Sequence, residues 1–209
     1  MRRQWWGAVL PVVLGASLVT GCGDGGDETT SGSEADGVPE WAAPDDPMER
    51  TAAAGLEPAV RELLLTHRHS HLDVFVDGEP VLVPAGIGID ITDPGVRTFS
   101  GPAYGGIEEC NQPCISPLHT HDVTGILHTE SAADGFLTLG QFFTEWDVRL
   151  DDGCVGEFCD DATDVAFYVD GEVHEGDPAL IELEDRREIA IVVGTPPETI
   201  PDSADFSAA

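Results

Sequence analysis

Polar and apolar residues alternate with a period of two between residues 67 and 76. Successive side chains of a strand lie on opposite faces, so this stretch is expected to form a strand with one polar and one apolar face. The polar face carries His67, His69, His71 and Asp73. The apolar face carries Leu72, Val74 and Val76. Asp77-Gly78 is a strong hairpin signal, and residues 79–83 are expected to return as the partner strand.

Further strand and turn signals follow later in the chain. Residues 164–169 read as a strand, and Asp170-Gly171 repeats the hairpin signal. Residues 181–193 are expected to form two strands about a polar turn. The short stretch 85–91 is apolar and rich in glycine.

Two segments show helical spacing instead. Residues 55–66 predict a short helix with Pro58 in its first turn and an apolar stripe. Residues 136–146 predict a second helix, with Thr138 as its N-cap and an aromatic stripe that we interpret as core. This stripe consists of Leu139, Phe142, Phe143 and Trp146. The predicted fold is mainly β, a sandwich or a barrel-like structure built from hairpins, with two short helices.

The stretch from residue 119 to residue 130 holds the densest group of potential metal ligands. A two-residue loop at Thr124-Gly125 would place His121 opposite His128 and His119 opposite Glu130 on one face of a hairpin. A three-residue loop is the alternative, because Thr is unfavourable at a turn position with positive φ. That register would move His128 and Glu130 to the other face. We prefer the one-face arrangement, since it accounts for four potential ligands within twelve residues.

Three imidazoles and a carboxylate on one face suit a transition-metal ion, either Zn, Cu, Fe or Ni. His69 and His71 are the next candidates, because their strand presents the same alternating imidazoles. Asp73 or Asp122 could accept a hydrogen bond from a ligating imidazole. His174 has no partner in the sequence and is expected to play no part. The competing interpretation is a hydrogen-bonded polar face between two sheets.

The N-terminus has the features of an export signal. Two arginines precede a mostly apolar stretch, which ends in small residues before Cys22. This ending resembles a bacterial lipobox, which implies cleavage after residue 21 and lipidation of the Cys22 thiol. An ordinary signal peptide with a chance cysteine is the alternative. We therefore expect an exported protein, anchored by lipid to the outer face of the cell membrane.

The predicted organisation has four parts. Residues 1–21 form the signal peptide, and residues 22–51 form the lipidated cysteine and a flexible acidic linker. Residues 52–201 form a single β-rich domain, and residues 202–209 form a C-terminal tail.

The chain is strongly acidic, with 9 basic residues against 40 acidic ones and a formal net charge of -31. This charge excludes nucleic acid as an expected partner and disfavours adsorption to anionic membrane surfaces. The only membrane contact expected is through the lipid, and no protein partner can be named.

Four cysteines remain after Cys22. They form two close pairs, and an exported protein lives where disulfides persist. Of the three possible connectivities we favour the two local bridges, Cys110–Cys114 and Cys154–Cys159. A thiol metal site or a redox pair is the competing interpretation.

Several segments together resemble an uncharacterised family of bacterial exported proteins. They are HSHLDVFVDGEPVLVPAGIGI, LHTHDVTGILHTE, LTLGQFFTEW, FYVDGE and IAIVVGTP, and they span most of residues 69–197. The resemblance implies no particular activity. The pattern fits cupins badly, because cupins place a glutamate where this chain has Gly125 or Ile126.

Two functions of different class follow from these patterns. The first is a membrane-anchored protein that captures, buffers or delivers a transition-metal ion. The second is a metal-dependent enzyme acting on a small molecule, with an open coordination position. A structural domain without metal is a third possibility. No Gly-x-Ser-x-Gly, glycine-rich phosphate loop or His-Glu-x-x-His motif occurs in the chain.

Overall fold

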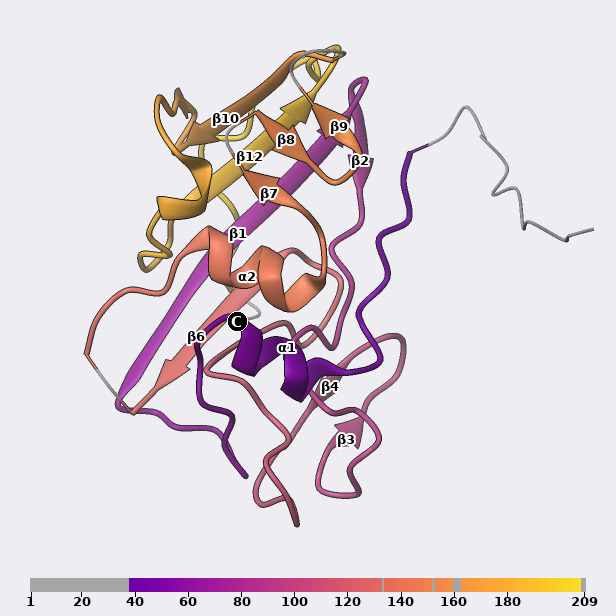
Figure 1. Ribbon diagram of the computed structural model, residues 1–209, viewed down its shortest axis with the longest axis vertical. Helices are drawn as coiled ribbons and strands as arrows, with labels where there is room; N and C mark the ends of the chain where they lie inside the picture. The colour runs from indigo at the N-terminus through magenta and orange to yellow at the C-terminus, as the bar shows by residue number, and fades with distance from the viewer. Residues whose placement is uncertain (1–37, 133, 152, 160–162, 208–209) are drawn as a thin grey trace, which may run out of the picture. The chain divides into compact units, whose positions relative to one another are not determined.

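The computed structural model describes residues 38–132, 134–151, 153–159 and 163–207 (Figure 1). The predicted signal peptide, Cys22 and the first part of the predicted linker lie outside these residues. Within the described ranges, no helix combines the length and the apolar character needed to cross a membrane.

A seven-stranded sheet forms the centre of the fold. Its strands are β1 (Thr66–Val76), β2 (Glu79–Val81), β5 (Leu118–His119), β6 (Ile126–Ser131), β10 (Val165–Val169), β11 (Glu172–Val173) and β12 (Glu188–Val193). The order is β11-β10-β12-β1-β6-β5, with β2 also paired to β1. Only the pairing of β1 with β12 is parallel among these described strands. The prediction of a mainly β fold with two short helices is confirmed, and the described strands form open sheets rather than a closed barrel.

Two smaller sheets complete the β structure. One pairs β3 (Arg97–Thr98) with β4 (Tyr104–Gly105), and the other contains β7 (Leu150–Asp151), β8 (Cys154–Val155) and β9 (Phe158–Cys159). The second of these contains the Cys154–Cys159 pair. Val155 of β8 is fully buried in the main core, and the hairpin holds it there.

Both predicted Asp-Gly hairpins are present and share one geometry. Asp77 and Gly78 have φ values of 50° and 85°, and Asp170 and Gly171 have values of 51° and 80°. Two successive residues with positive φ are typical of a type I′ turn, which matches the twist of the flanking strands. The side chain of Asp77 also accepts a hydrogen bond from the backbone of Thr195, at 3.0 Å. This contact ties the first hairpin to the chain that follows β12.

Helix α2 (Leu139–Trp146) matches the predicted second helix. Thr138 is its N-cap, and the side chains and backbones of Thr138 and Gln141 form a reciprocal capping box. The four predicted core residues of the stripe are all buried. They pack with the apolar face of the main sheet, including Leu72 and Val74 of β1, and α2 lies across that face in Figure 1.

The predicted helix over residues 55–66 is wrong. This segment is irregular, because its backbone hydrogen bonds go to a neighbouring loop: Ala59 donates to the carbonyl of Ile115, and the amide of Cys114 donates to the carbonyl of Ala59. Its apolar stripe faces no core, since Leu64 is 61% exposed.

The first helix instead lies upstream, as α1 (Pro47–Ala53). Pro47 at the start of this helix needs no hydrogen-bond partner for its nitrogen. Trp41, further upstream, packs edge-on against Trp146, and its carbonyl accepts the indole N–H of that residue at 3.0 Å. Residues before position 52 therefore take part in the packing of the domain.

The first of the two strands predicted within residues 181–193 is also absent. The short 3-10 helix η1 (Pro178–Leu180) is followed by an extended segment with one isolated bridge, between Glu182 and Thr138. Ile181 and Leu183 are buried in the core beside α2. Their alternation reflects packing under that helix and not pairing along a sheet.

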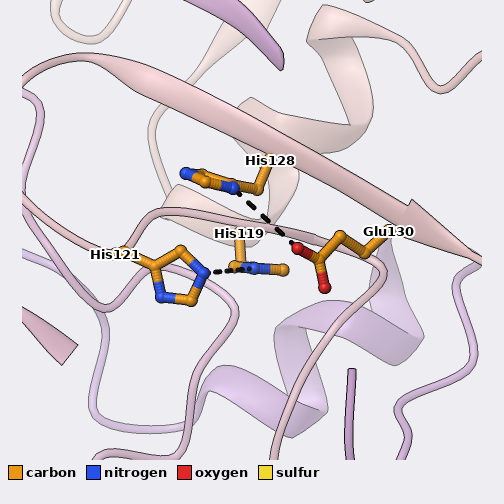
Figure 2. Close-up of side chains that lie close together, drawn as sticks. All are labelled: His119, His121, His128 and Glu130. Carbon is orange, nitrogen blue, oxygen red and sulfur yellow. Dashed lines mark hydrogen bonds and ion pairs between the residues drawn. The ribbon is translucent and has the colours of Figure 1, made fainter. Parts of the chain in front are cut away.

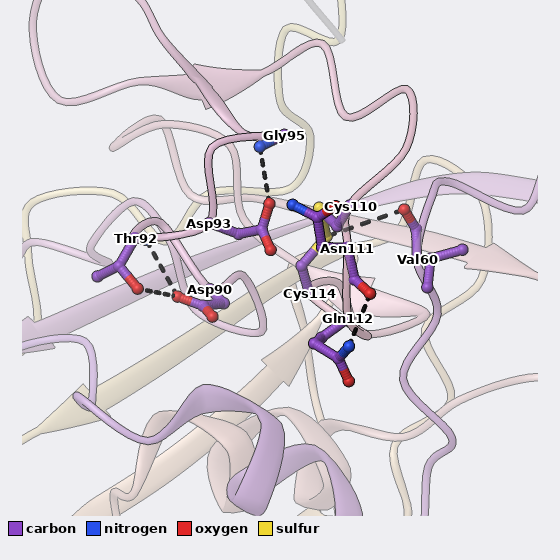
Figure 3. Close-up of a disulfide and its surroundings, with 9 residues drawn as sticks. All are labelled: Val60, Asp90, Thr92, Asp93, Gly95, Cys110, Asn111, Gln112 and Cys114. Atoms are coloured by element: carbon purple, nitrogen blue, oxygen red, sulfur yellow. Dashed lines mark hydrogen bonds between the residues drawn. A yellow bond between two sulfur atoms is a disulfide. The ribbon is translucent and has the colours of Figure 1, made fainter.

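Both predicted disulfides are confirmed, Cys110–Cys114 and Cys154–Cys159. Figure 3 shows the first of them among tight turns, in which side chains of Asp90 and Asp93 accept hydrogen bonds from the backbones of Thr92 and Gly95. The cysteines pack with Ile89, Val96, Ile107 and Ile115 in a second, smaller core. This loop-rich region has little regular structure, and the bridge closes it beside the strand that leads to His119.

Candidate metal centre

Strands β5 and β6, with the loop between them, bring four predicted ligands together on one side of the main sheet. His119, His121, His128 and Glu130 each offer a ligand atom, and these atoms lie within 4.8 Å of one another (Figure 2). We call these four residues the inner cluster. The face they occupy is the one opposite α2, because the alternating residues Leu127 and Thr129 point into the core side.

The register that produces this cluster differs from both predicted registers. Leu118 pairs with Thr129 and His119 pairs with His128, so the strands are shifted by two residues from the two-residue-loop prediction. A shift of two keeps every side chain on its face, whereas a shift of one would not. The one-face arrangement is therefore confirmed, although the predicted opposing pairs are wrong.

A longer loop explains the shift. Residues 120–125 form no strand, and the Asp122 carboxylate accepts hydrogen bonds from both the backbone and the hydroxyl of Thr124. Gly125, at φ 84°, does not close a tight turn but lies against β1. Its carbonyl accepts the amide of Leu72, and a Cβ at this position would come within 2.7 Å of the Leu72 carbonyl oxygen. Asp122 is thus occupied within the loop, and the prediction that it orients an imidazole is wrong.

Two imidazoles of the inner cluster face each other through the same ring atom. The Nδ1 of His119 donates to the carbonyl of Ser116 at 2.9 Å, and the Nδ1 of His121 donates to the carbonyl of Tyr104 at 2.7 Å. A neutral imidazole has one N–H, so each Nε2 carries a lone pair. These two Nε2 atoms lie 3.1 Å apart, shown by a dashed line in Figure 2. Two lone pairs at this distance repel each other unless a proton or a cation lies between them.

Burial disfavours a proton between the Nε2 atoms of His119 and His121. His119 is 0% exposed, and this burial, together with the neighbouring charge of His121, lowers its pKa well below the ordinary value for histidine. Burial also lowers the pKa of His128, and the surrounding imidazoles lower it further. His119 and His128 are therefore held in the neutral form at neutral pH, which is the form that binds metal ions.

His128 and Glu130 supply the remaining ligand atoms. Both side chains are buried, yet the Nδ1 of His128 and the Oε2 of Glu130 have no hydrogen-bond partner among the described residues. Burial raises the pKa of Glu130 to about 7, and the nearby charge of Glu62 adds to this effect. A buried polar atom without a hydrogen-bond partner costs about 1–3 kcal/mol of folding free energy. A ligand bound to these two atoms would remove that cost.

A buried carboxyl group supports the inner cluster from the core side. Glu145 of α2 lies 2.5 Å from the hydroxyl of Ser116, whose carbonyl orients His119. Burial raises the pKa of Glu145 to about 8, so it holds a proton at neutral pH. Sequence patterns did not single out Ser116, Glu145 or Tyr104. The one available signal was the acidic residue within the aromatic stripe of α2, where a core helix would ordinarily be apolar.

His71 is not part of the inner cluster. Its Nε2 donates to the carbonyl of Thr124 at 2.8 Å, and its Nδ1 lies 3.0 and 3.1 Å from the two carboxylate oxygens of Glu188. Burial disfavours the charged form of His71, but the hydrogen bond and charge of Glu188, with Asp73, outweigh it and raise the pKa. The doubly protonated ring is therefore favoured, and both of its N–H groups face oxygen acceptors. We call His71, Asp73 and Glu188 the ion-pair cluster.

The other predicted ligand of β1, His69, does reach the inner cluster. It lies opposite His128 in the ladder between β1 and β6, and the centroids of the two imidazole rings are 4.5 Å apart. His67, which we had not counted as a ligand, lies opposite Glu130. His174 follows β11, at the opposite edge of the main sheet.

A cavity of about 290 Å³ opens beside the inner cluster. Its lining includes His121 and His128, together with Glu62 and the rings of Phe99 and Tyr104. An ion or a small molecule can reach the imidazoles of His121 and His128 from this side. In comparisons with known proteins, no family model, curated protein or solved structure matches the chain, so its function has to be argued from this site.

Proposed function

We propose that the protein binds a transition-metal ion, Zn, Cu, Fe or Ni, through His119, His121, His128 and Glu130. The observation that carries this proposal is the pair of opposed Nε2 atoms of His119 and His121. Each ring is fixed by a hydrogen bond from Nδ1 to a backbone carbonyl, which is how ligating histidines are commonly oriented.

The spacing of these atoms suits an ion. Two nitrogens bound at 2.0–2.1 Å to a tetrahedral ion lie about 3.3 Å apart. The observed separation of 3.1 Å is close to this value. His128 and Glu130 complete a set of three imidazoles and one carboxylate, and an ion would satisfy the buried atoms that otherwise have no partner.

We further propose that the protein captures, buffers or delivers this ion at the outer face of the cell membrane. The abundance of histidine around the site and the acidic net charge of -31 both favour the collection of cations. The anchor is the lipid on Cys22 predicted from the sequence. Cys22→Ala is expected to release the protein from the membrane fraction, and a variant that stays as tightly bound as wild type would contradict the anchor.

A metal-dependent enzyme is the second candidate, because the cavity beside His121 and His128 could admit a small molecule to the ion. A bound ion that carries an exchangeable water would favour the enzyme hypothesis. Binding of small carboxylates or phosphates to the metal-loaded protein, seen as a change in the spectrum of a Co²⁺ substitute, would separate it from a closed binding site.

Metal analysis of the full chain, purified without a histidine tag after growth in metal-replete medium, tests the main proposal. We expect near-stoichiometric Zn, Cu, Fe or Ni in the wild type and a large loss in His119→Ala and His121→Ala. His174→Ala is the matched control and should keep its metal. Wild-type protein without any of these metals, or equal metal in His121→Ala, would refute the proposal.

A further inference from the structure

We propose that a second divalent ion binds between β1 and β6, held by His67, His69 and His128, so that the site is a two-metal centre with His128 and Glu130 at its middle. This inference rests on the proposed function, because the second ion shares residues with the inner cluster. We call His67 and His69, with the shared His128, the outer cluster.

The ladder register places β6 at the centre of this arrangement. On one side of β6, His119 of β5 pairs with His128. On the other side, His69 of β1 pairs with the same residue, and His67 pairs with Glu130. The two residues of β6 therefore have potential ligands on both flanks. The ligand atoms of His67, His69 and His128 lie within 4.8 Å of one another, as a group distinct from the inner cluster.

Two nitrogens of the outer cluster also have no hydrogen-bond partner in the described part of the chain. The Nε2 of His69 and the Nδ1 of His128 are buried and make no hydrogen bond to any described residue. The ring centroid of His69 lies 4.6 Å from that of His67 and 4.5 Å from that of His128. The Nε2 of His67 lies 3.3 Å from an oxygen of Glu130. An ion between these rings would give the two buried nitrogens a partner.

The spacing of the strands argues for two ions and not one. Neighbouring strands lie about 4.8 Å apart, so ligands from β5 and from β1 approach β6 from positions separated by about twice that distance. One ion with bonds of 2.0–2.1 Å cannot reach both flanks. Two ions can, if His128 gives up its remaining N–H proton to solvent and binds one ion through each ring nitrogen, while Glu130 binds through its two carboxylate oxygens.

Negative charge near the outer cluster would offset the charge of a second ion. The carboxylate of Asp185 accepts a hydrogen bond from the backbone of His69 at 3.1 Å, and Glu130 faces His67. The negative charge of Glu62 also interacts electrostatically with Glu130. Two divalent ions would thus be set among acidic groups in a chain that is acidic throughout.

The two positions differ in their access to solvent. The side chain of His67 is 45% exposed, whereas His119 is fully buried. The outer position therefore exchanges its ion more readily than the inner position, whose ligand His119 is fully buried. Because both positions share residues of β6, an ion can pass from one to the other without release. This arrangement fits a protein that captures a transition-metal ion and hands it on.

Titration of the metal-free full chain with Zn²⁺ tests this arrangement. We expect two equivalents to bind, the first at least about 10-fold more tightly than the second, in line with the loss that a weakened ligand set produces. The double variant His67→Ala/His69→Ala should bind one equivalent with the tight affinity retained. His119→Ala/His121→Ala should lose the tight equivalent. His174→Ala is the control and should bind two.

The outcomes separate the second ion from the proposed function. One equivalent in the wild type, unchanged in His67→Ala/His69→Ala, would overturn the second ion and leave the inner cluster as a single site. One equivalent that this double variant loses would place a single ion at the outer cluster and overturn the two-metal centre. No binding in the wild type would overturn both proposals. His67→Gln, at an exposed position, serves where the double variant does not fold, and it should weaken only the second equivalent.

Discussion

The inner cluster and the ion-pair cluster use the same residue types on one face of one sheet, and the structure arranges them in opposite ways. In the ion-pair cluster, both nitrogens of His71 point at oxygens, those of Glu188 and of Thr124. In the inner cluster, the Nε2 atoms of His119 and His121 point at each other. An imidazole between two acceptors binds protons, whereas imidazoles with opposed lone pairs are suited to a metal ion.

The comparison shows that the second nitrogen of a histidine decides its chemistry. His119 and His121 each give one proton to a backbone carbonyl and so present a lone pair. His71 also bonds to a backbone carbonyl, but Glu188 lies at its other nitrogen and favours the charged ring. Position within a His-x-His or His-x-Asp pattern does not reveal this difference.

The largest expected effect comes from removing the histidine shared by both ion positions. His128→Ala should lower the affinity for Zn²⁺ by at least about 1000-fold, because the loss of a ligand exceeds the 10–100-fold that outer partners contribute. Isothermal titration of wild type and variant measures this. An affinity within about 10-fold of wild type would mean that His128 is only a packed side chain, like those of the ion-pair cluster.

Removing His71 should affect stability and leave metal binding intact. His71→Ala strands the buried carboxylate of Glu188, and the loss of one member of a buried ion pair costs about 3–5 kcal/mol. Urea unfolding of the metal-free protein measures the change.

The double variant His71→Ala/Glu188→Gln is the control for the ion pair. It should recover part of the lost stability, because no uncompensated charge remains. Loss of one equivalent of Zn²⁺ in His71→Ala, in protein that is still folded, would contradict the distinction between the two clusters.

Glu145 tests a buried carboxyl group that has no cation beside it in the described structure. Its pKa of about 8 in the fold lies above the ordinary value of 4.5, so its contribution to stability is complete below pH 4.5 and is lost as the pH rises through about 8. Glu145→Gln has no such dependence. Relative to this variant, the wild type should lose about 1.4 kcal/mol of unfolding free energy per pH unit between those values. Parallel pH profiles for the two proteins would contradict a buried, protonated Glu145.

The smallest effect expected is at Glu130. Because burial raises its pKa to about 7, a proton competes with the ion below that pH, and the carboxylate contributes to binding only above it. Glu130→Gln should therefore weaken Zn²⁺ binding by about 10-fold at pH 8 and by much less at pH 6. The loss is smaller than for His128→Ala because the side-chain carbonyl oxygen of glutamine can still bind the ion. Affinities measured at both pH values check this. An equal loss at both would place the carboxyl group outside the binding site.

Much of the fold could be predicted because local chemistry determined it. The Asp-Gly turns at residues 77 and 170 fix two hairpins, and the Thr138 cap with its aromatic stripe fixes α2. The helix predicted over residues 55–66 is absent because contacts distant in sequence determine this segment. Its helical spacing was real, but its backbone finds partners in the loop around Ile115, and no pattern in the sequence marks that contact.

The site was predicted in part for a similar reason. Parity along a strand placed His119, His121, His128 and Glu130 on one face, and parity survives a register error of two residues. The role of His71 could not be predicted in the same way. Its partner Glu188 lies more than a hundred residues away, and their contact depends on the parallel pairing of β1 with β12.

That parallel pairing also has a consequence for how the chain folds. Strand β1 (Thr66–Val76) sits between β6 and β12, and β12 (Glu188–Val193) is the last strand of the described chain. Contacts between segments so distant in sequence form only after a long loop has closed, which costs conformational entropy. Such topologies therefore fold slowly. Until β12 arrives, the backbone N–H and C=O groups along one edge of β1 have no partner strand. A nascent or truncated chain that ends before residue 188 would therefore depend on chaperones to keep this edge from pairing with other molecules.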